Sequence, residues 1–261
     1  MAIVALLTDF GTTDYYVAAM KGSILQVDPK ATLVDISHDI PSQDVYHAAF
    51  VLRQVLPCFP AKTIFTCVVD PGVGTSRRIL AARYSDRVIL APDNGLLTLV
   101  HRDADLQEVR TVENRRFFAS TLSSTFHGRD IFAPVAGHLS KGVALDHLGP
   151  VADRIEILNL AKPVRHPDGS MTGEVQIVDR FGNLITNISV LDLSAARAGH
   201  RQLQVSVKGV VVGPLRITYG DVPPGELVAL IGSSQMLEIG VNQGSAAERL
   251  GARRGDPVQV C

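Results

Sequence analysis

The chain is poor in the residues that stabilise small secreted or metal-dependent proteins. Its 261 residues include no tryptophan and three cysteines, and aromatic residues make up 5% of the total. The cysteines at positions 58, 67 and 261 are an odd number and lack the spacing of a metal-ligand motif. This pattern indicates free thiols in a reducing compartment rather than a disulfide framework. We therefore expect a cytoplasmic protein.

Charge of one sign and long apolar runs are also missing. The formal net charge is −1, and no basic stripe with interleaved aromatic residues occurs, so we expect no nucleic-acid partner. No segment approaches the roughly 20 apolar residues that span a bilayer, which excludes a membrane helix. Residues 1–7 are apolar but have neither a basic leader nor a cleavage site, and we interpret them as a first strand.

The order of the apolar segments predicts two domains. In residues 1–160, strand-like runs alternate with helical spacing, which is typical of an α/β domain with a largely parallel central sheet. The predicted strands are 3–7, 32–36, 63–69, 79–84 and 88–91, and the predicted helices are 15–27, 44–56, 95–101 and 130–140. Residues 161–261 contain short strands separated by Gly, Pro and Asn. We expect them to form a smaller all-β, barrel-like domain.

Ionisable side chains next to glycine and proline concentrate in two segments, residues 68–78 and 124–130. Asp70 comes directly after a predicted central strand, Asp9 follows the first strand, and residues 92–95 follow another. Because ligands of open α/β sheets bind beyond the carboxyl ends of the strands, these loops are expected to form one site.

The residue types in these loops suggest several chemistries. The glycines at 72 and 74 invite a phosphate-binding interpretation, but the segment fits neither a dinucleotide fingerprint nor a P-loop. A divalent metal site is a second alternative, although no pair has known ligand spacing; its candidate ligands are Asp9, His38, Asp39, Asp70, Asp93 and His127. Positions 38 and 39 are better interpreted as a hydrogen-bonded turn. No Gly-x-Ser-x-Gly elbow supports a serine nucleophile.

The favoured interpretation is activation of a water molecule by Asp70, Arg77 and His127. Arginine remains protonated, so Arg77 can hold Asp70 bidentately and stabilise a forming hydroxide, but cannot act as a base. Histidine titrates near neutrality, so His127 is a candidate to accept a proton from water. The alternative is that Asp70 and Arg77 only stiffen a loop.

Six motifs in order along the chain resemble the S-adenosyl-L-methionine (SAM) hydroxide adenosyltransferases, long known as domain of unknown function 62, which are relatives of the fluorinase and chlorinase. The motifs are TDFG (8–11), VDPGVG (69–74) with Arg77, APDNG (91–95), FHGRD (126–130), VDRFGNLITN (178–187), and GSS (232–234) followed by LEI (237–239). They extend from the first strand to the last segment.

The resemblance implies a fold and a reaction. The family has an N-terminal α/β domain and a smaller C-terminal β domain, and it forms homotrimers with the substrate between domains of neighbouring subunits. Water attacks the ribose C5′ of SAM and yields adenosine and L-methionine, without a metal or cofactor. The family's Asp–Arg–His set falls on Asp70, Arg77 and His127.

The resemblance also implies substrate contacts. Asp9 resembles the carboxylate that accepts hydrogen bonds from the ribose hydroxyls, and Asp179 resembles the partner of the methionine ammonium. The remaining positions are Phe181 and Asn183 on the adenine side, and Ser233, Glu238 and Val241 where the C-terminal domain closes the pocket. Gln235 and Met236 replace an expected Gly-Tyr.

Differences from the halogenases favour water as the nucleophile. Those relatives have an aromatic residue at the position of Asp70 and tyrosine at that of His127, and the fluorinase has serine where this chain has Gly128. A chlorinase-like halide adenosyltransferase and a non-catalytic adenosine or SAM sensor stay open as alternatives.

Overall fold

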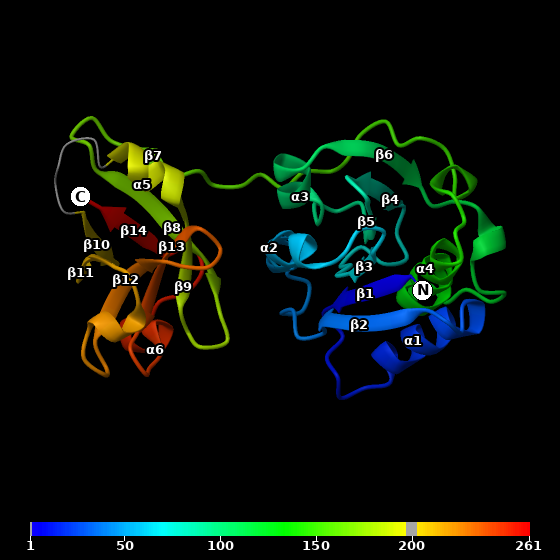
Figure 1. Cartoon of the computed structure of the whole chain (residues 1–261), viewed down its shortest axis with the longest axis horizontal. Coiled ribbons are helices and arrows are strands. Elements are labelled where there is room, and N and C mark those ends of the chain that lie inside the picture. Colours follow the sequence, from blue (N-terminus) through cyan, green and yellow to red (C-terminus); the bar gives the residue numbers. More distant parts are fainter. Residues whose placement is uncertain (1, 197–202) are drawn as a thin grey trace. The chain divides into compact units, whose positions relative to one another are not determined.

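The computed structural model describes residues 2–196 and 203–261, and the chain divides into two compact units, Met1–Asn159 and Leu160–Cys261. Figure 1 shows a mixed α/β unit and a β-rich unit. This confirms the predicted fold class. No helix among the described residues is long and apolar enough to cross a membrane.

The N-terminal unit is a six-stranded sheet covered by helices on both faces. The strand order is β2-β1-β3-β5-β4-β6, with parallel pairing from β2 to β5 and antiparallel pairing of β4 with β5 and β6. Its elements are β1 (Ile3–Thr8), α1 (Tyr16–Val27), β2 (Thr32–Ser37), α2 (Val45–Val55), η1 (Leu56–Cys58), β3 (Ile64–Val68), β4 (Ile79–Tyr84), β5 (Arg87–Pro92), α3 (Thr98–Asp103), β6 (Leu106–Thr111), η2 (Arg115–Phe117), η3 (Gly128–Phe132, a π-helical turn), α4 (Ala133–Ser140) and η4 (Leu145–His147).

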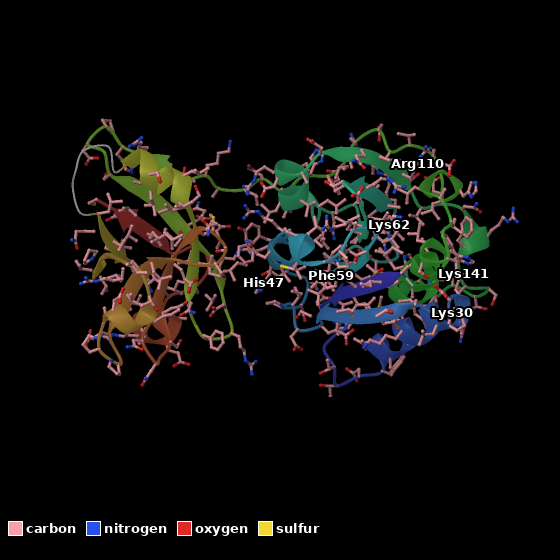
Figure 2. The ribbon with its side chains drawn as sticks, viewed as in Figure 1. Lys30, His47, Phe59, Lys62, Arg110 and Lys141 are labelled. Carbon is pink, nitrogen blue, oxygen red and sulfur yellow. The ribbon has the colours of Figure 1, made fainter. Side chains whose placement is uncertain are left out.

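Burial on both faces explains the unbroken apolar runs of the central strands. All five residues of β3 are buried, and so are the last five of β1. Helices α1 and α4 pack with one face of the sheet, whereas α2 and α3 pack with the other. Figure 2 shows the side chains that fill these layers. The ring centroids of Phe59 and Phe65 lie 5.3 Å apart. The two cores leave the carboxyl ends of β1 and β3 free to carry loops.

The C-terminal unit is a closed barrel. Its strands run in the order β14-β10-β11-β12-β13-β9-β8, and β14 pairs with β8 to close the ring. The short strand β7 forms an antiparallel pair with β8. The elements are β7 (Val164–Arg165), β8 (Met171–Val178), β9 (Leu184–Ser189), α5 (Val190–Ala196), β10 (Gln204–Val207), β11 (Val210–Arg216), η6 (Tyr219–Asp221), β12 (Leu227–Ile231), β13 (Met236–Val241), α6 (Ala246–Leu250) and β14 (Pro257–Val260).

Some elements differ from the sequence prediction. The sequence predicts that Gly and Pro separate the C-terminal strands, but β11 continues through Gly213 and Pro214, with a register shift opposite Val205. The short helices α5 and α6 and strand β6 were not predicted. Their sequences are too short or too polar to show a clear hydrophobic period.

Candidate active site

Asp70 and Arg77 form a buried ion pair in the loop between β3 and β4. Nε of Arg77 lies 3.0 and 2.9 Å from the two carboxylate oxygens of Asp70, and Nη2 of Arg77 donates to Oδ2. The side chain of Arg77 is 10% exposed and that of Asp70 is 4% exposed. A guanidinium that approaches with two nitrogens fixes the orientation of the carboxylate as well as its charge. Asp70 therefore faces its surroundings as a rigid, oriented acceptor.

The glycines of this loop allow it to pack against the 124–130 segment. Gly74 has φ +77°, and a Cβ at this position would lie 2.5 Å from the backbone oxygen of Ser124. An L-residue would be both strained and in collision there. A Cβ on Gly72 would lie 3.2 Å from Cγ of Arg77. The backbone contact at Gly74 explains how two segments far apart in sequence meet.

His127 completes the cluster that the sequence predicts. Nη2 of Arg77 lies 3.0 Å from Nδ1 of His127. Because arginine can only donate, Nδ1 is the acceptor and the neutral ring carries its proton on Nε2. Burial lowers the pKa of His127, and the nearby positive charge of Arg77 lowers it further. The imidazole is therefore held neutral with one defined tautomer.

A cavity of about 560 Å³ opens beside this cluster, a size suited to a small organic ligand. Asp70 and His127 both line it. So does Asp9, whose Oδ2 accepts a hydrogen bond from the backbone N–H of Gln43 at 2.8 Å. Much of the rest of the wall is aromatic, from Phe10, Tyr15, Tyr16 and Phe126. Three of the predicted acidic and basic side chains thus share one concave surface.

The buried carboxylate of Asp130 stabilises the loop that carries His127. Asp130 is 2% exposed and accepts hydrogen bonds from Arg129 Nε at 2.6 Å and from the backbone N–H of Ser123 at 2.7 Å. The Arg129 guanidinium also stacks 4.9 Å above the Phe126 ring. This network holds both ends of the 123–130 loop. Burial alone would raise the pKa of Asp130, but the hydrogen bonds from Arg129 and Ser123 outweigh it and lower the pKa, so the ionised form is favoured.

The third predicted loop, residues 92–95, carries an aspartate with a structural role. Asp93 does not line the cavity, because its carboxylate binds Arg78 at 2.7 and 2.9 Å and the backbone N–H of Glu156 at 2.8 Å. Arg78 in turn reaches Asp153 at 2.6 Å. The expectation that residues 92–95 join the site is therefore wrong for Asp93, which fastens the 153–156 segment to the sheet.

The metal alternative has no geometric support among the described residues, where no three His, Cys, Asp or Glu side chains converge. His38 turns toward Thr8 and Asp35, and His127 turns toward Arg77.

In the C-terminal unit, Asp179 and Asn183 close the tight turn between β8 and β9. Oδ1 of Asp179 accepts the backbone N–H groups of Phe181 at 2.8 Å and Asn183 at 2.9 Å, and its Oδ2 lies 3.0 Å from Nδ2 of Asn183. Gly182, at φ +82°, completes the turn. The ring of Phe181 projects from its tip and is 77% exposed. This turn presents an apolar ring beside a polar pair.

A tyrosine that sequence reasoning missed links this turn to Glu238. The Tyr219 hydroxyl donates to Oε1 of Glu238, and Nδ2 of Asn183 lies 3.4 Å from the same hydroxyl. Glu238 is 6% exposed, and its burial raises its pKa. Tyr219 lies 19 residues before Glu238, outside any motif, so nothing in the local sequence pointed to it.

The other two predicted residues are placed differently. Ser233 is exposed in the turn between β12 and β13, whereas Val241 is 7% exposed and belongs to the barrel core. Of the barrel residues, Asp179, Asn183 and Glu238 are joined in one network through Tyr219, and Phe181 stands next to it.

Together these features define a two-unit protein in which an oriented Asp–Arg–His cluster faces a nucleoside-sized cavity. The chain matches the SAM hydroxide adenosyltransferase N-terminal domain over residues 4–149 and the C-terminal domain of the same family over residues 173–259. The chain belongs to the SAM hydroxide adenosyltransferase family.

Named relatives cover the chain from end to end. It is 40% identical to an (R)-S-adenosyl-L-methionine hydrolase of Thermus thermophilus over 100% of both chains. A hydrolase of the same name from Salinispora tropica is 38% identical over 98% of this chain and 97% of its own. A fluorinase of an Actinoplanes species is 30% identical over 99% and 97%.

Solved structures agree with the fold. A crystal structure of an uncharacterized conserved protein from Thermotoga maritima superposes with a TM-score of 0.91 at 39% identity, and covers 99% of each chain. A conserved hypothetical protein from Thermus thermophilus gives a TM-score of 0.80 at 38% identity over 100% of both chains.

Proposed function

We propose that this protein hydrolyses S-adenosyl-L-methionine, and its (R) sulfonium epimer in particular, to adenosine and L-methionine. The observation that carries the proposal is the Asp70–Arg77–His127 chain of contacts at the wall of the cavity. The family supplies the substrate class, and the (R) prefix comes from the names of the Thermus and Salinispora relatives.

The substrate makes the reaction electrostatically simple. Its sulfonium leaves as a neutral thioether, so no acid has to protonate the leaving group. Water oxygen forms the bond to C5′, the C5′–S bond breaks, and its electron pair stays on sulfur. Because positive charge moves from sulfur to the attacking water, an oriented carboxylate next to that water stabilises the transition state. In-line placement of the water supplies much of the remaining acceleration.

We assign the proton to Asp70 rather than to His127, and the contacts of the two side chains support this choice. With Nδ1 occupied by the Arg77 N–H, the neutral imidazole has no free lone pair and offers only an Nε2–H. Each Asp70 oxygen retains lone pairs beyond those used by Arg77. Asp70 therefore takes the proton that the attacking water loses, Arg77 holds both partners, and His127 orients the water by donating to it.

The substrate contacts follow the family positions. Asp9, at the cavity wall, is assigned to the ribose hydroxyls. In the barrel, Asp179 is assigned to the methionine ammonium and the Phe181–Asn183 pair to adenine, with Ser233, Glu238 and Val241 closing the pocket. A homotrimer that brings barrel and cavity of different subunits together is part of the proposal, and light scattering of the purified protein tests it.

The decisive experiment uses each sulfonium epimer separately in water enriched in ¹⁸O. We expect adenosine and methionine, with the label in the 5′-hydroxyl of adenosine, and faster turnover of the (R) epimer. Label in any other position contradicts attack at C5′. Equal rates for the two epimers leave hydrolysis intact but refute the stereochemical preference.

The same assay separates the alternatives. A halide adenosyltransferase, as in the fluorinase relatives, converts SAM and chloride to 5′-chloro-5′-deoxyadenosine. A sensor binds SAM without forming product. The positions of Asp70 and His127 favour water, because a carboxylate can accept and an imidazole N–H can donate a hydrogen bond to a water molecule, whereas a carboxylate repels an attacking halide.

A further inference from the structure

His38, which follows β2, is a buried histidine with contacts on both ring nitrogens. Its side chain is 4% exposed. Nδ1 lies 2.8 Å from Oγ1 of the fully buried Thr8, and Nε2 lies 3.0 Å from Oδ1 of Asp35, although the ring N–H is not aligned for a hydrogen bond there. The sequence predicted only a turn at this position. Burying a polar ring costs desolvation free energy unless the ring is hydrogen-bonded, and the contact with Thr8 supplies a partner for Nδ1.

The pairing of β1 with β2 brings His38 to Thr8. The two strands are parallel, and their register shifts after Leu6, so that Leu7 lies opposite Ser37. Thr8, the last residue of β1, and His38, the first residue after β2, therefore lie side by side at the carboxyl ends of these strands. Both precede loops that reach the cavity.

His38 fastens the Asp9 loop at both of its ends. Oγ1 of Thr8, which contacts Nδ1 of His38, also accepts the backbone N–H of Phe10 at 3.3 Å. At the other end, the backbone oxygen of His38 accepts the N–H of Gly11 at 2.7 Å, where Gly11 has φ +67°. The backbone that carries Asp9 is thus tied to a single residue of the neighbouring loop.

The same neighbouring loop orients the Asp9 carboxylate. Gln43, in the left-handed region at φ +65°, donates its N–H to Oδ2 of Asp9. In the part of the chain that the structure describes, Oδ1 of Asp9 receives no hydrogen bond. One carboxylate oxygen is therefore fixed and the other is free to accept from a ligand in the cavity.

We propose that His38 is a positioning residue for Asp9, acting through Thr8 and Gly11 to hold that carboxylate toward the ribose hydroxyls of the substrate. This inference rests on the proposed function, in which Asp9 binds the ribose. His38 lies outside the cavity wall, so its effect on the substrate is indirect.

Two substitutions of His38 distinguish the contribution of Nδ1 from that of Nε2. In His38→Asn, the side-chain oxygen occupies the place of Nδ1 and can still accept from Thr8. In His38→Gln, the terminal amide extends toward the place of Nε2 and Asp35, and the contact with Thr8 is lost. We expect Asn to rescue function and Gln to fail, and Thr8→Val to share the defect of Gln without adding to it.

The measurement is the affinity for adenosine compared with 2′,3′-dideoxyadenosine, by calorimetry, because it depends on ribose binding and not on turnover. The wild type is expected to prefer adenosine by about tenfold, since its hydroxyls bond to a charged carboxylate. In His38→Gln this preference falls about three- to tenfold, while the affinity for the dideoxynucleoside changes less than about twofold. Asp9→Ala gives the same loss of preference.

The outcomes distinguish the two proposals. Equal loss of affinity for both nucleosides in His38→Gln, or an unchanged preference, overturns the positioning role of His38. A wild type that does not discriminate between the nucleosides overturns the ribose role of Asp9 and this inference with it. A wild type that discriminates but forms no adenosine from SAM refutes only the proposed hydrolysis. His138→Asn, a half-buried histidine of α4 outside the cavity, is the matched control and should bind both nucleosides normally.

Discussion

Replacement of Arg77 by lysine tests whether the guanidinium acts by geometry or by charge alone. Lysine retains the positive charge but offers a single nitrogen. In the native site, Nε and Nη2 of Arg77 both contact Asp70, and Nη2 also reaches His127 at 3.0 Å. One ammonium cannot reproduce the bidentate contact and the contact with Nδ1 together. Arg77→Lys therefore removes two charge-assisted hydrogen bonds and keeps the ion pair.

The expected loss follows from those two bonds. Each contributes about 1.5–3 kcal/mol, so the lower bound of their sum is about 3 kcal/mol. If both act in the transition state, kcat falls by about a hundredfold or more, since every 1.36 kcal/mol is about a factor of ten. KM should change little, because Arg77 lies behind Asp70 and does not line the cavity.

Arg78→Lys is the matched control, one residue further along the chain. Arg78 binds Asp93 and Asp153 away from the cavity, so its replacement should lower the melting temperature and leave kcat within about twofold. Steady-state release of adenosine measures both variants, with thermal unfolding to show that each is folded. An Arg77→Lys enzyme that keeps more than a tenth of the wild-type kcat refutes the geometric role of the guanidinium.

Three further perturbations probe the packing, the barrel network and the titration of the site. Gly74→Ala places a methyl group against the Ser124 backbone oxygen at a positive φ, so it should destabilise the fold by about 1–3 kcal/mol and reduce kcat. Denaturant unfolding and turnover, measured in parallel, test both effects. A variant with wild-type stability and activity contradicts the contact. Tyr219→Phe leaves the buried Glu238 without its donor and should raise KM for SAM more than it lowers kcat, whereas unchanged kinetics would exclude this network from substrate binding. The lowered pKa of His127 keeps the ring neutral down to pH values below the ordinary value of about 6.5, so activity should be level above that pH and fall only below it. The unfolded chain binds this proton more readily than the folded chain does. The stability that the neutral His127 ring contributes is therefore complete above about pH 6.5 and is lost as the pH falls through the pKa of His127 in the folded protein. An NMR titration of the ring with an inflection above pH 6.5 contradicts this expectation.

Hydrophobic periodicity predicted an α/β layer arrangement for the first unit and a β barrel for the second, and residue type made Asp70 and His127 candidates. Residue type could not decide between the adjacent Arg77 and Arg78. Consecutive side chains entering a strand point to opposite sides, and this directs Arg77 to Asp70 and Arg78 to Asp93. The pairing depends on three-dimensional register, which local sequence does not encode.

The role of each polar residue also depends on its hydrogen-bond partners, which the sequence does not reveal. Asp70 and Asp93 both follow buried strands and both bind an arginine, yet of the two only Asp70 lines the cavity, whereas Asp93 binds Arg78 and the backbone N–H of Glu156. The role predicted for His127 as a proton acceptor likewise depended on which nitrogen was free, and only the contact with Arg77 shows that Nδ1 is occupied. Residue types identify the groups that can transfer a proton, whereas their hydrogen-bond partners decide which group donates and which accepts.

The charges of the proposed binding residues fit the difference between substrate and products. Asp70 is balanced by Arg77 and Arg129 by Asp130, so Asp9 leaves the cavity wall negative toward a substrate whose sulfonium, ammonium and carboxylate sum to a charge of +1. Hydrolysis removes the sulfonium charge, and the products are a neutral nucleoside and a zwitterion. Opposite charges attract strongly at short range in a partly desolvated site, so the cation is held before reaction and that attraction is lost with the C5′–S bond. The same chemical step that forms the products therefore weakens their binding and favours their release.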